Sequence, residues 1–162
     1  AMKVVSNTTP SIGLASIGQF SLLREFFGEI IIARAVFDEA VTQGHEKGGA
    51  KNEISSAKWI QVLEVKDRLA IEILLDELDL GESETIVLAR EINADWVLMD
   101  EKKGRRMLDQ LKIPKIGTVG ILLKAKQLGF LKSLRPELEK LQSLGFTLNQ
   151  IVVDKVLHDA GE

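Results

Sequence analysis

Polar side chains whose oxygens can bind metal follow the predicted strands of this 162-residue chain. Asn7 comes after an apolar strand at residues 4–6, Asp100 ends the apolar run at residues 96–99, and Glu82 lies in the first turn of a predicted helix. In parallel α/β sheets, ligands bind at the carboxyl ends of the strands, beside the amino ends of the following helices. We therefore expect these side chains to share one edge of a sheet.

Glu39, in a helix predicted at residues 34–41, completes a set of three carboxylates and one amide. Oxygen ligands without Cys or His suit a hard divalent cation such as Mg²⁺ or Mn²⁺. Two such ions roughly 4 Å apart would clamp an in-line displacement at phosphorus. The set as a whole therefore predicts a metal site for phosphoryl chemistry.

Ordinary structural roles remain open for single members of this set. Asn7 could be a turn residue that bonds the backbone, and Asp100 could cap the helix predicted at residues 102–111. Glu39 comes a turn after Val36, late in its helix, where periodicity alone favours a solvated side chain.

Glu82 and Glu84 lie on different faces of one predicted helix, because residues two apart do not face each other. Glu82 lies on the same helix face as Ile86, four residues later, and this face is apolar. We therefore expect Glu82 to point toward the buried side. Glu84 shares its face with Leu88, and we expect it to point away and to interact only with the helix dipole.

Short apolar strands alternate with helices, which is typical of an α/β fold with a parallel sheet flanked by helices. Strands are predicted at residues 4–6, 30–32, 59–65, 96–99 and 115–116. Helices are predicted at residues 10–17, 22–27, 34–41, 69–78, 82–92, 102–111, 118–128, 134–144 and 148–159, and the glycine-rich stretch 44–49 is predicted as a loop. We expect one domain over residues 2–162, with a helical C-terminal extension from about residue 133.

Several classes of site are excluded by composition. The chain has no cysteine and two histidines, so thiolate zinc sites and poly-histidine sites lack ligands. Neither GxGxxG nor GxxxxGK[ST] occurs, which removes the main signals for dinucleotide and P-loop binding. No apolar run approaches the roughly 20 residues of a membrane span, and no secretion signal opens the chain, so we expect a cytoplasmic protein without membrane contact.

Charge is distributed unevenly along the chain. Residues 1–100 hold 17 acidic and 9 basic side chains, whereas residues 101–162 hold 7 acidic and 12 basic ones. Such a basic block can face phosphates. Taken alone, it is more often the solvated side of several helices.

Four segments, taken in order, resemble PIN-domain proteins, and most closely the prokaryotic branch of small, toxin-like PIN nucleases. These segments are VVSNTTPSIGLASIG, EIIIARAVFDEAV, LGESETIVLAREINADWVLMDEKKGRRM and IGTVGILLKAKQLGFL. The resemblance implies an α/β ribonuclease that depends on Mg²⁺ or Mn²⁺. It also implies the toxin of a toxin–antitoxin pair, with RNA as substrate, an antitoxin protein as partner, and a homodimer as the assembly.

The resemblance assigns roles to individual residues. Asn7, Glu39, Glu82 and Asp100 fall on the four catalytic and metal-binding positions of the family, and Glu101 is a potential additional acid. The RNA-binding positions are assigned to Thr8, Lys102, Lys103, Arg105 and Arg106. These basic residues would hold the RNA backbone with little base preference.

Asn7 departs from the family pattern, which has an aspartate at this position. An asparagine still offers an oxygen to a metal but removes one negative charge. A second hypothesis follows, in which the chain is a catalytically weakened or inactive PIN-like module that binds an antitoxin or RNA.

Overall fold

The computed structural model describes residues 2–46 and 50–162, and these form five strands and ten helices. The strands are β1 (Val4–Ser6), β2 (Ile30–Ala33), β3 (Ile60–Leu63), β4 (Trp96–Leu98) and β5 (Lys115–Ile116). The helices are α1 (Thr8–Ser16), α2 (Ser21–Phe27), α3 (Arg34–Glu46), α4 (Ala50–Ser56), α5 (Arg68–Leu74), α6 (Leu80–Glu91), α7 (Lys102–Gln110), α8 (Thr118–Gln127), α9 (Arg135–Ser143) and α10 (Gln150–Asp159).

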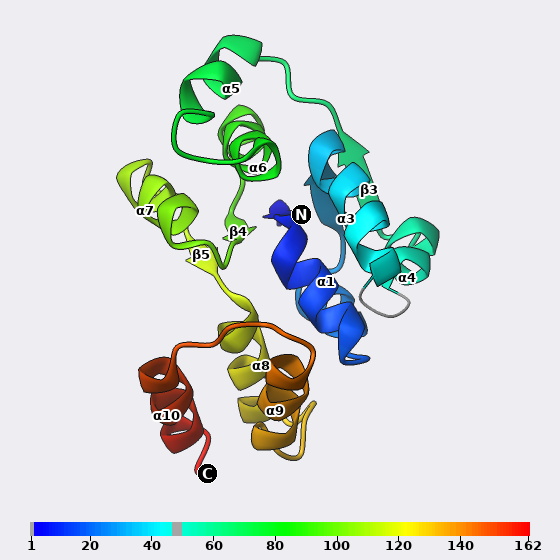
Figure 1. Cartoon of the computed structure of the whole chain (residues 1–162), viewed down its shortest axis with the longest axis vertical. Coiled ribbons are helices and arrows are strands. Elements are labelled where there is room, and N and C mark those ends of the chain that lie inside the picture. The colour runs from blue at the N-terminus through cyan, green and yellow to red at the C-terminus, as the bar shows by residue number, and fades with distance from the viewer. Residues whose placement is uncertain (1, 47–49) are drawn as a thin grey trace.

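All five strands run parallel in one sheet, in the order β3-β2-β1-β4-β5. Val5 pairs with Val97 and Ser6 with Leu98, so β1 and β4 end at the same level of the sheet. The helices surround the sheet, with α5 and α10 at opposite ends of the molecule (Figure 1). The predicted α/β fold with a parallel sheet flanked by helices is confirmed.

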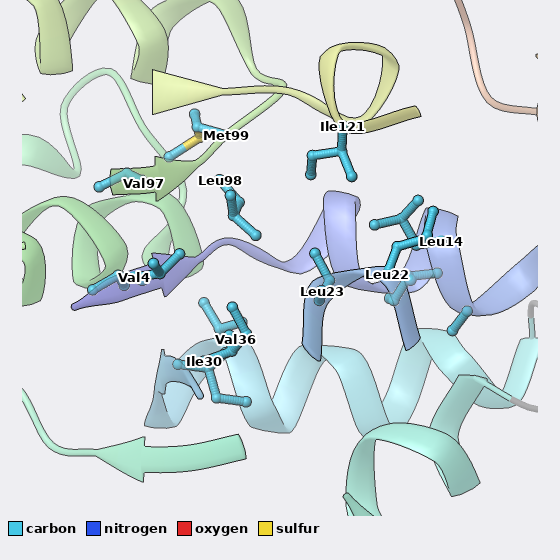
Figure 2. Packing of buried hydrophobic residues seen from close by; sticks show 14 of the residues in the cluster. Val4, Leu14, Leu22, Leu23, Ile30, Val36, Val97, Leu98, Met99 and Ile121 are labelled. Atoms are coloured by element: carbon cyan, nitrogen blue, oxygen red, sulfur yellow. The ribbon is translucent and has the colours of Figure 1, made fainter. Parts of the chain in front are cut away.

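The core forms because the three central strands, β2, β1 and β4, carry mostly buried residues on both faces, as expected inside a parallel sheet. Figure 2 shows Val4, Ile30 and Leu98 of three adjacent strands packed with Val36 of α3 and Ile121 of α8. The same cluster of buried residues extends to Leu138, Val156 and other side chains of α9 and α10. Within the described residues, no helix has both the length and the apolarity to cross a membrane.

Helix α4 (Ala50–Ser56) was not predicted from the sequence. It follows the glycine-rich stretch directly, and within its described part Ile54 is its one buried apolar side chain. So short a helix shows almost no repeat of apolar residues by which it could be predicted. Its stability comes from packing against α3 and α1.

Glu162 caps the amino end of α9. Its carboxylate accepts hydrogen bonds from the Ser133 hydroxyl at 2.7 Å, the Leu134 backbone N–H at 2.6 Å and the Arg135 backbone N–H at 3.2 Å. Leu134, the N-cap residue, has no polar side chain for this task. These hydrogen bonds to the charged form lower the pKa of Glu162 from 4.5 to about 2.

Replacing Glu162 with glutamine is expected to lower the melting temperature at pH 7. Because the folded-state pKa is depressed, the contribution of Glu162 to stability is complete above pH 4.5 and is lost as the pH falls toward 2. Thermal melts of wild type and Glu162→Gln should therefore converge near pH 2. Glu139→Gln, an exposed carboxylate on α9, is the matched control and should melt like wild type. A gap between wild type and Glu162→Gln that does not change with pH would contradict this account.

Candidate active site at the β1–β4 edge

The strand order creates a crevice where β1 and β4 lie side by side. The chain leaves β1 toward β2 on one side and leaves β4 toward β5 on the other, which is the switch point where α/β sheets bind ligands. Asn7 follows β1 directly, and its backbone N–H donates to the Leu98 carbonyl oxygen at 2.9 Å. Asp100 comes two residues after the end of β4. The predicted placement of both residues at strand exits is therefore correct.

Glu39 reaches this edge from α3 and is half-buried rather than solvated. Its Oε2 accepts a hydrogen bond from the Thr8 hydroxyl at 2.9 Å. Burial raises the pKa of Glu39, and the nearby charge of Asp79 raises it further, whereas hydrogen bonds from Thr8 and the Gly81 backbone lower it. A Cβ atom on Gly81 would lie 2.5 Å from Oε1 of Glu39, so the Glu39 carboxylate can occupy this position only because residue 81 has no side chain.

Glu82 lies in the first turn of α6 and takes part in a reciprocal capping box with Asp79. The Asp79 carboxylate accepts from the Glu82 backbone N–H at 2.7 Å, and the Glu82 carboxylate accepts from the Asp79 backbone N–H at 3.0 Å. Burial is the largest cause that raises the pKa of Glu82. The charges of Asp79, Glu101 and Glu39 raise it further. We call Glu39, Asp79, Glu82 and Glu101 the acidic cluster.

Both carboxylate oxygens of Asp100 accept hydrogen bonds from Thr118. Its Oδ1 accepts from the Thr118 backbone N–H at 2.8 Å, and its Oδ2 accepts from the Thr118 hydroxyl at 2.6 Å. Asp100 therefore caps α8, whose own N-cap residue is Gly117. The alternative in which Asp100 caps the helix at residues 102–111 is wrong, because Glu101 is the N-cap residue of α7.

Asn7 is 4% exposed and directly follows β1 at this edge of the sheet. Its Nδ2 donates to Sδ of Met99 at 3.4 Å, a weak hydrogen bond between the exits of β1 and β4. Thr8, the next residue, is also buried, and its hydroxyl is donated to Glu39. Thr8 therefore orients Glu39, and RNA-binding by Thr8 stays a prediction that its burial does not favour.

The prediction that Glu84 points away from the buried side is wrong. Glu84 is 5% exposed, accepts from the Ala35 backbone N–H at 3.0 Å, and accepts from Nη1 of Arg68 at 2.9 Å. It thereby satisfies one of the free N–H groups at the start of α3, the helix that carries Glu39. The prediction assumed that α6 has one buried face and one solvated face. In the structure, α6 packs against the sheet, α3, α5 and α7, so both faces are buried.

Replacing Glu84 with alanine is expected to destabilise the fold by about 1–3 kcal/mol, because the buried Ala35 N–H loses its acceptor. Glu84→Gln keeps an acceptor oxygen for Ala35 and should cost less. Chemical denaturation of the two variants measures the difference. Equal stability of Glu84→Ala and wild type would show that this buried carboxylate does not hold α3.

The donor chemistry of this edge suits a divalent cation, but the side chains are not gathered around one point. Among the residues that the structure describes, no three Asp, Glu or His side chains are close enough together to hold a metal ion. Glu39 and Glu82 nevertheless carry raised pKa values, which reflect burial first and then the repulsion of neighbouring acids, chiefly Asp79. A bound cation would relieve that repulsion, so the acidic cluster fits Mg²⁺ or Mn²⁺ by charge and by ligand type.

The basic residues of α7 divide into two groups. Lys102, Lys103 and Arg106 are exposed, as a role in phosphate binding requires. Arg105 is half-buried, and its Nη1 donates to the Met99 carbonyl oxygen at 2.7 Å, which fixes the exit of β4. RNA binding by these residues stays a prediction, with the exposed three better placed for it than Arg105.

A family model described as a PIN domain matches residues 3–162. The chain belongs to the PIN-domain family. The resemblance inferred from the four sequence segments is therefore confirmed over nearly the whole chain.

A solved structure of a PIN-type fold is similar to this one at low sequence identity. It is that of Mycobacterium tuberculosis VapC20, described as a sarcin-ricin loop cleaving toxin. The match has a TM-score of 0.54 and 14% identity, and it covers 65% of this PIN-domain chain and 95% of VapC20. At this identity the likeness shows the shared fold alone. No curated protein has significant sequence similarity to the chain.

Asp79 belongs to the acidic cluster but was not predicted from the sequence as a site residue. The signal was present, since an aspartate three residues before a glutamate at a helix start is the pattern of a capping box. Gly81, between them, carries no such signal, because its role depends on Glu39 from another helix.

Proposed function

We propose that this PIN-domain protein is a divalent-metal-dependent ribonuclease that hydrolyses RNA phosphodiesters and acts as the toxin of a toxin–antitoxin pair. One observation carries the proposal. Two half-buried glutamates, Glu39 and Glu82, converge from separate helices beside the β1–β4 edge, where burial raises the pKa of both and the charge of their common neighbour Asp79 raises it further. Like charges gathered at the ligand-binding edge of a sheet are costly for folding and are typical of functional sites.

Four positions would hold the cation in this proposal. Glu39 and Glu82 supply carboxylates, the β4–α7 turn with Asp100 and Glu101 supplies a further acid, and Asn7 supplies a weaker amide oxygen. A divalent cation held by these residues would supply charge neutralisation at the phosphodiester and lower the pKa of an attacking water. Thr8 keeps Glu39 oriented, and the capping box keeps Glu82 at the start of α6.

RNA would be held by the exposed cations of α7. Lys102, Lys103 and Arg106 follow the β4 exit and present positive charge next to the acidic cluster. Contacts of this kind bind the phosphate backbone, so we expect affinity to fall as salt rises and base preference to be weak.

Cleavage of labelled RNA in the presence of Mn²⁺ tests this function. We expect wild type to cut RNA, EDTA to stop the reaction, and Glu82→Gln to lower the rate by at least about 100-fold, the scale of losing a charge-stabilising group. Glu72→Gln removes an exposed carboxylate of α5 and is the matched control, which should cut like wild type. If wild type and Glu82→Gln degrade RNA equally, the activity does not come from this site.

A second candidate function is a catalytically weakened PIN module that binds an antitoxin or RNA. One observation favours it, since Asn7 offers an amide oxygen where the family has a carboxylate. The Asn7→Asp variant separates the candidates. Activity that is absent in wild type and appears in Asn7→Asp would identify the natural protein as a binding module.

The remaining parts of the proposal concern the whole chain. We propose that residues 2–162 act as one domain, that the protein works in the cytoplasm, and that it forms a homodimer. The exposed apolar side chains of the C-terminal helices support a dimer surface, since Ile151 is 80% exposed and Val152 is 45% exposed. Gel filtration should then show a species of twice 17.9 kDa, and a monomer at high concentration would exclude the dimer.

A further inference from the structure

A cavity of about 570 Å³ adjoins the β4 exit, and Asp100 forms part of its wall. The rest of the wall comes from the start of α8, from the segment that connects α9 to α10, and from α10 itself. Figure 1 shows this connection passing across α8 to reach α10, and α8 and α10 are in contact. Small-molecule sites have volumes of roughly 300–1,000 Å³, so the cavity is large enough for a nucleotide.

The lining of this cavity combines positive charge with apolar surface. Arg105 of α7 and Lys115 of β5 supply the positive charge. The apolar surface belongs to the C-terminal part of the chain and includes Phe146, Leu148 and Val152. This combination suits a ligand that has an anionic group and a flat apolar group, as a nucleotide does.

Arg105 keeps donors for an anionic group. Its Nη1 donates to the Met99 carbonyl oxygen at 2.7 Å, and its guanidinium makes no other hydrogen bond or ion pair with the described residues. A guanidinium carries five N–H groups in a planar fork that matches phosphate geometry. Lys115, by contrast, is already paired with Asp109. The half-burial that removes Arg105 from the outer surface of α7 therefore places an oriented phosphate ligand in the cavity.

Two exposed polar side chains of the lining, Thr147 and Asn149, can bond the edge of a base. Oδ1 of Asn149 caps α10 by accepting from the backbone N–H groups of Ile151 and Val152 at 2.9 Å and 3.3 Å. This arrangement fixes the amide and leaves Nδ2 as a donor. The Thr147 hydroxyl offers both a donor and an acceptor. Proteins that recognise unpaired RNA bases combine such groups with apolar and aromatic surface.

We propose that this cavity receives one unpaired base of the RNA substrate and thereby gives the nuclease a preference for one nucleotide beside the cut. The assignment rests on the proposed function above, which places the phosphodiester near Asp100. Arg105 binds a phosphate next to that base, and this positive charge favours a nucleotide over an apolar side chain of a protein partner. A paired base cannot enter, so the substrate is single-stranded at this position. The exposed cations of α7 carry no base information, so the preference comes from the cavity.

NMR titration with the nucleoside 5′-monophosphates of A, C, G and U tests the assignment without requiring catalysis. Ribose 5-phosphate, which has no base, is the comparison ligand. We expect at least one nucleotide to bind at least about tenfold more tightly than ribose 5-phosphate, the scale of one stacked base. This difference should appear with Mn²⁺ and also in EDTA.

Two variants that fill the cavity should abolish the preference for a base. Val152 is 45% exposed and Thr147 is also exposed, so Val152→Trp and Thr147→Trp can each place a large ring in the cavity without disturbing the core. Ile151→Trp is the matched control, because Ile151 is 80% exposed and lies outside the lining. Since Ile151 and Val152 both belong to the proposed dimer surface, this control also accounts for a change of assembly.

Sequencing of the ends that Mn²⁺ and wild type release from random single-stranded RNA gives a second measurement. One base should be enriched beside the cut, and Val152→Trp should lower that enrichment at least about tenfold, whereas Ile151→Trp keeps it. Cleavage by wild type without a base preference would overturn the assignment and leave the proposed function intact. Nucleotides that bind no more tightly than ribose 5-phosphate, or that bind folded Val152→Trp and Thr147→Trp like wild type, would also overturn it. Base-dependent binding in EDTA without any RNA cleavage would support the cavity and overturn the nuclease function.

Discussion

Replacing Asn7 with aspartate is expected to tighten Mn²⁺ binding by at least about tenfold and to increase RNA cleavage. Asn7 is buried at the crevice between β1 and β4, so a carboxylate there adds a full negative charge at the proposed cation site. Opposite unit charges about 4 Å apart attract by about 4 kcal/mol at an effective dielectric constant of 20, so tenfold, or about 1.4 kcal/mol, is a modest share of the available energy. Without the cation, the variant should melt at a lower temperature than wild type, because a buried charge has been added.

Asn93→Asp is the matched control for this substitution. Asn93 lies in the turn that precedes β4, at the opposite end of the strands from Asn7. The same change of chemistry there should leave Mn²⁺ binding unaltered. Equal Mn²⁺ affinities for wild type and Asn7→Asp would show that Asn7 lies outside the cation site and is not a ligand.

Replacing Gly81 with alanine is expected to disrupt the acidic cluster by steric means alone. The new methyl group would lie 2.5 Å from Oε1 and 3.1 Å from Cδ of Glu39, so this carboxylate must move away from α6. Because the clashing atoms are the end of a flexible side chain that can shift, we expect little loss of folding stability. Mn²⁺ binding should weaken as well, because Glu39 would no longer lie beside Glu82.

Gly13→Ala controls for the general effect of placing alanine in a helix. Around Gly13, in α1, the nearest atoms to an added Cβ lie at 3.6 Å or more, an ordinary contact distance. That variant should be as stable as wild type or more stable, because alanine favours the helix. If Gly81→Ala binds Mn²⁺ like Gly13→Ala, the observed position of the Glu39 carboxylate is not required for the site.

The sheet was predictable because its strands are continuous apolar runs. Residues 30–32 and 96–99 are β-branched or apolar throughout, and burial on both faces of a parallel sheet produces this pattern. Helix α4 was not predicted, because it has only seven residues. Within its described part Ile54 is the one buried apolar side chain, and one residue cannot define a helical repeat of apolar positions.

The sequence was sufficient to predict which elements meet at the site. It was not sufficient to predict which atoms form hydrogen bonds there. Asn7 and Asp100 follow strand exits and Glu82 lies at a helix start, as expected from the fold. Periodicity alone favoured a solvated Glu39, and only the family resemblance pointed to its place at this edge. The orientation of Glu84 was not predictable, because a helix enclosed on all sides has no single inward face. The capture of Asp100 by Thr118 depends on a contact between residues 18 positions apart, which no local pattern encodes.

The most direct test of the central claim is a calorimetric Mn²⁺ titration of wild type and of the double variant Glu39→Gln/Glu82→Gln. Thermal melts without metal at pH 7 should show the double variant at least as stable as wild type. The raised pKa values of both glutamates mean that their charged forms cost stability as the pH rises through those values. The account predicts saturable binding by wild type that is lost in the folded double variant. Equal heats of binding in both proteins, or none in folded wild type, would contradict it.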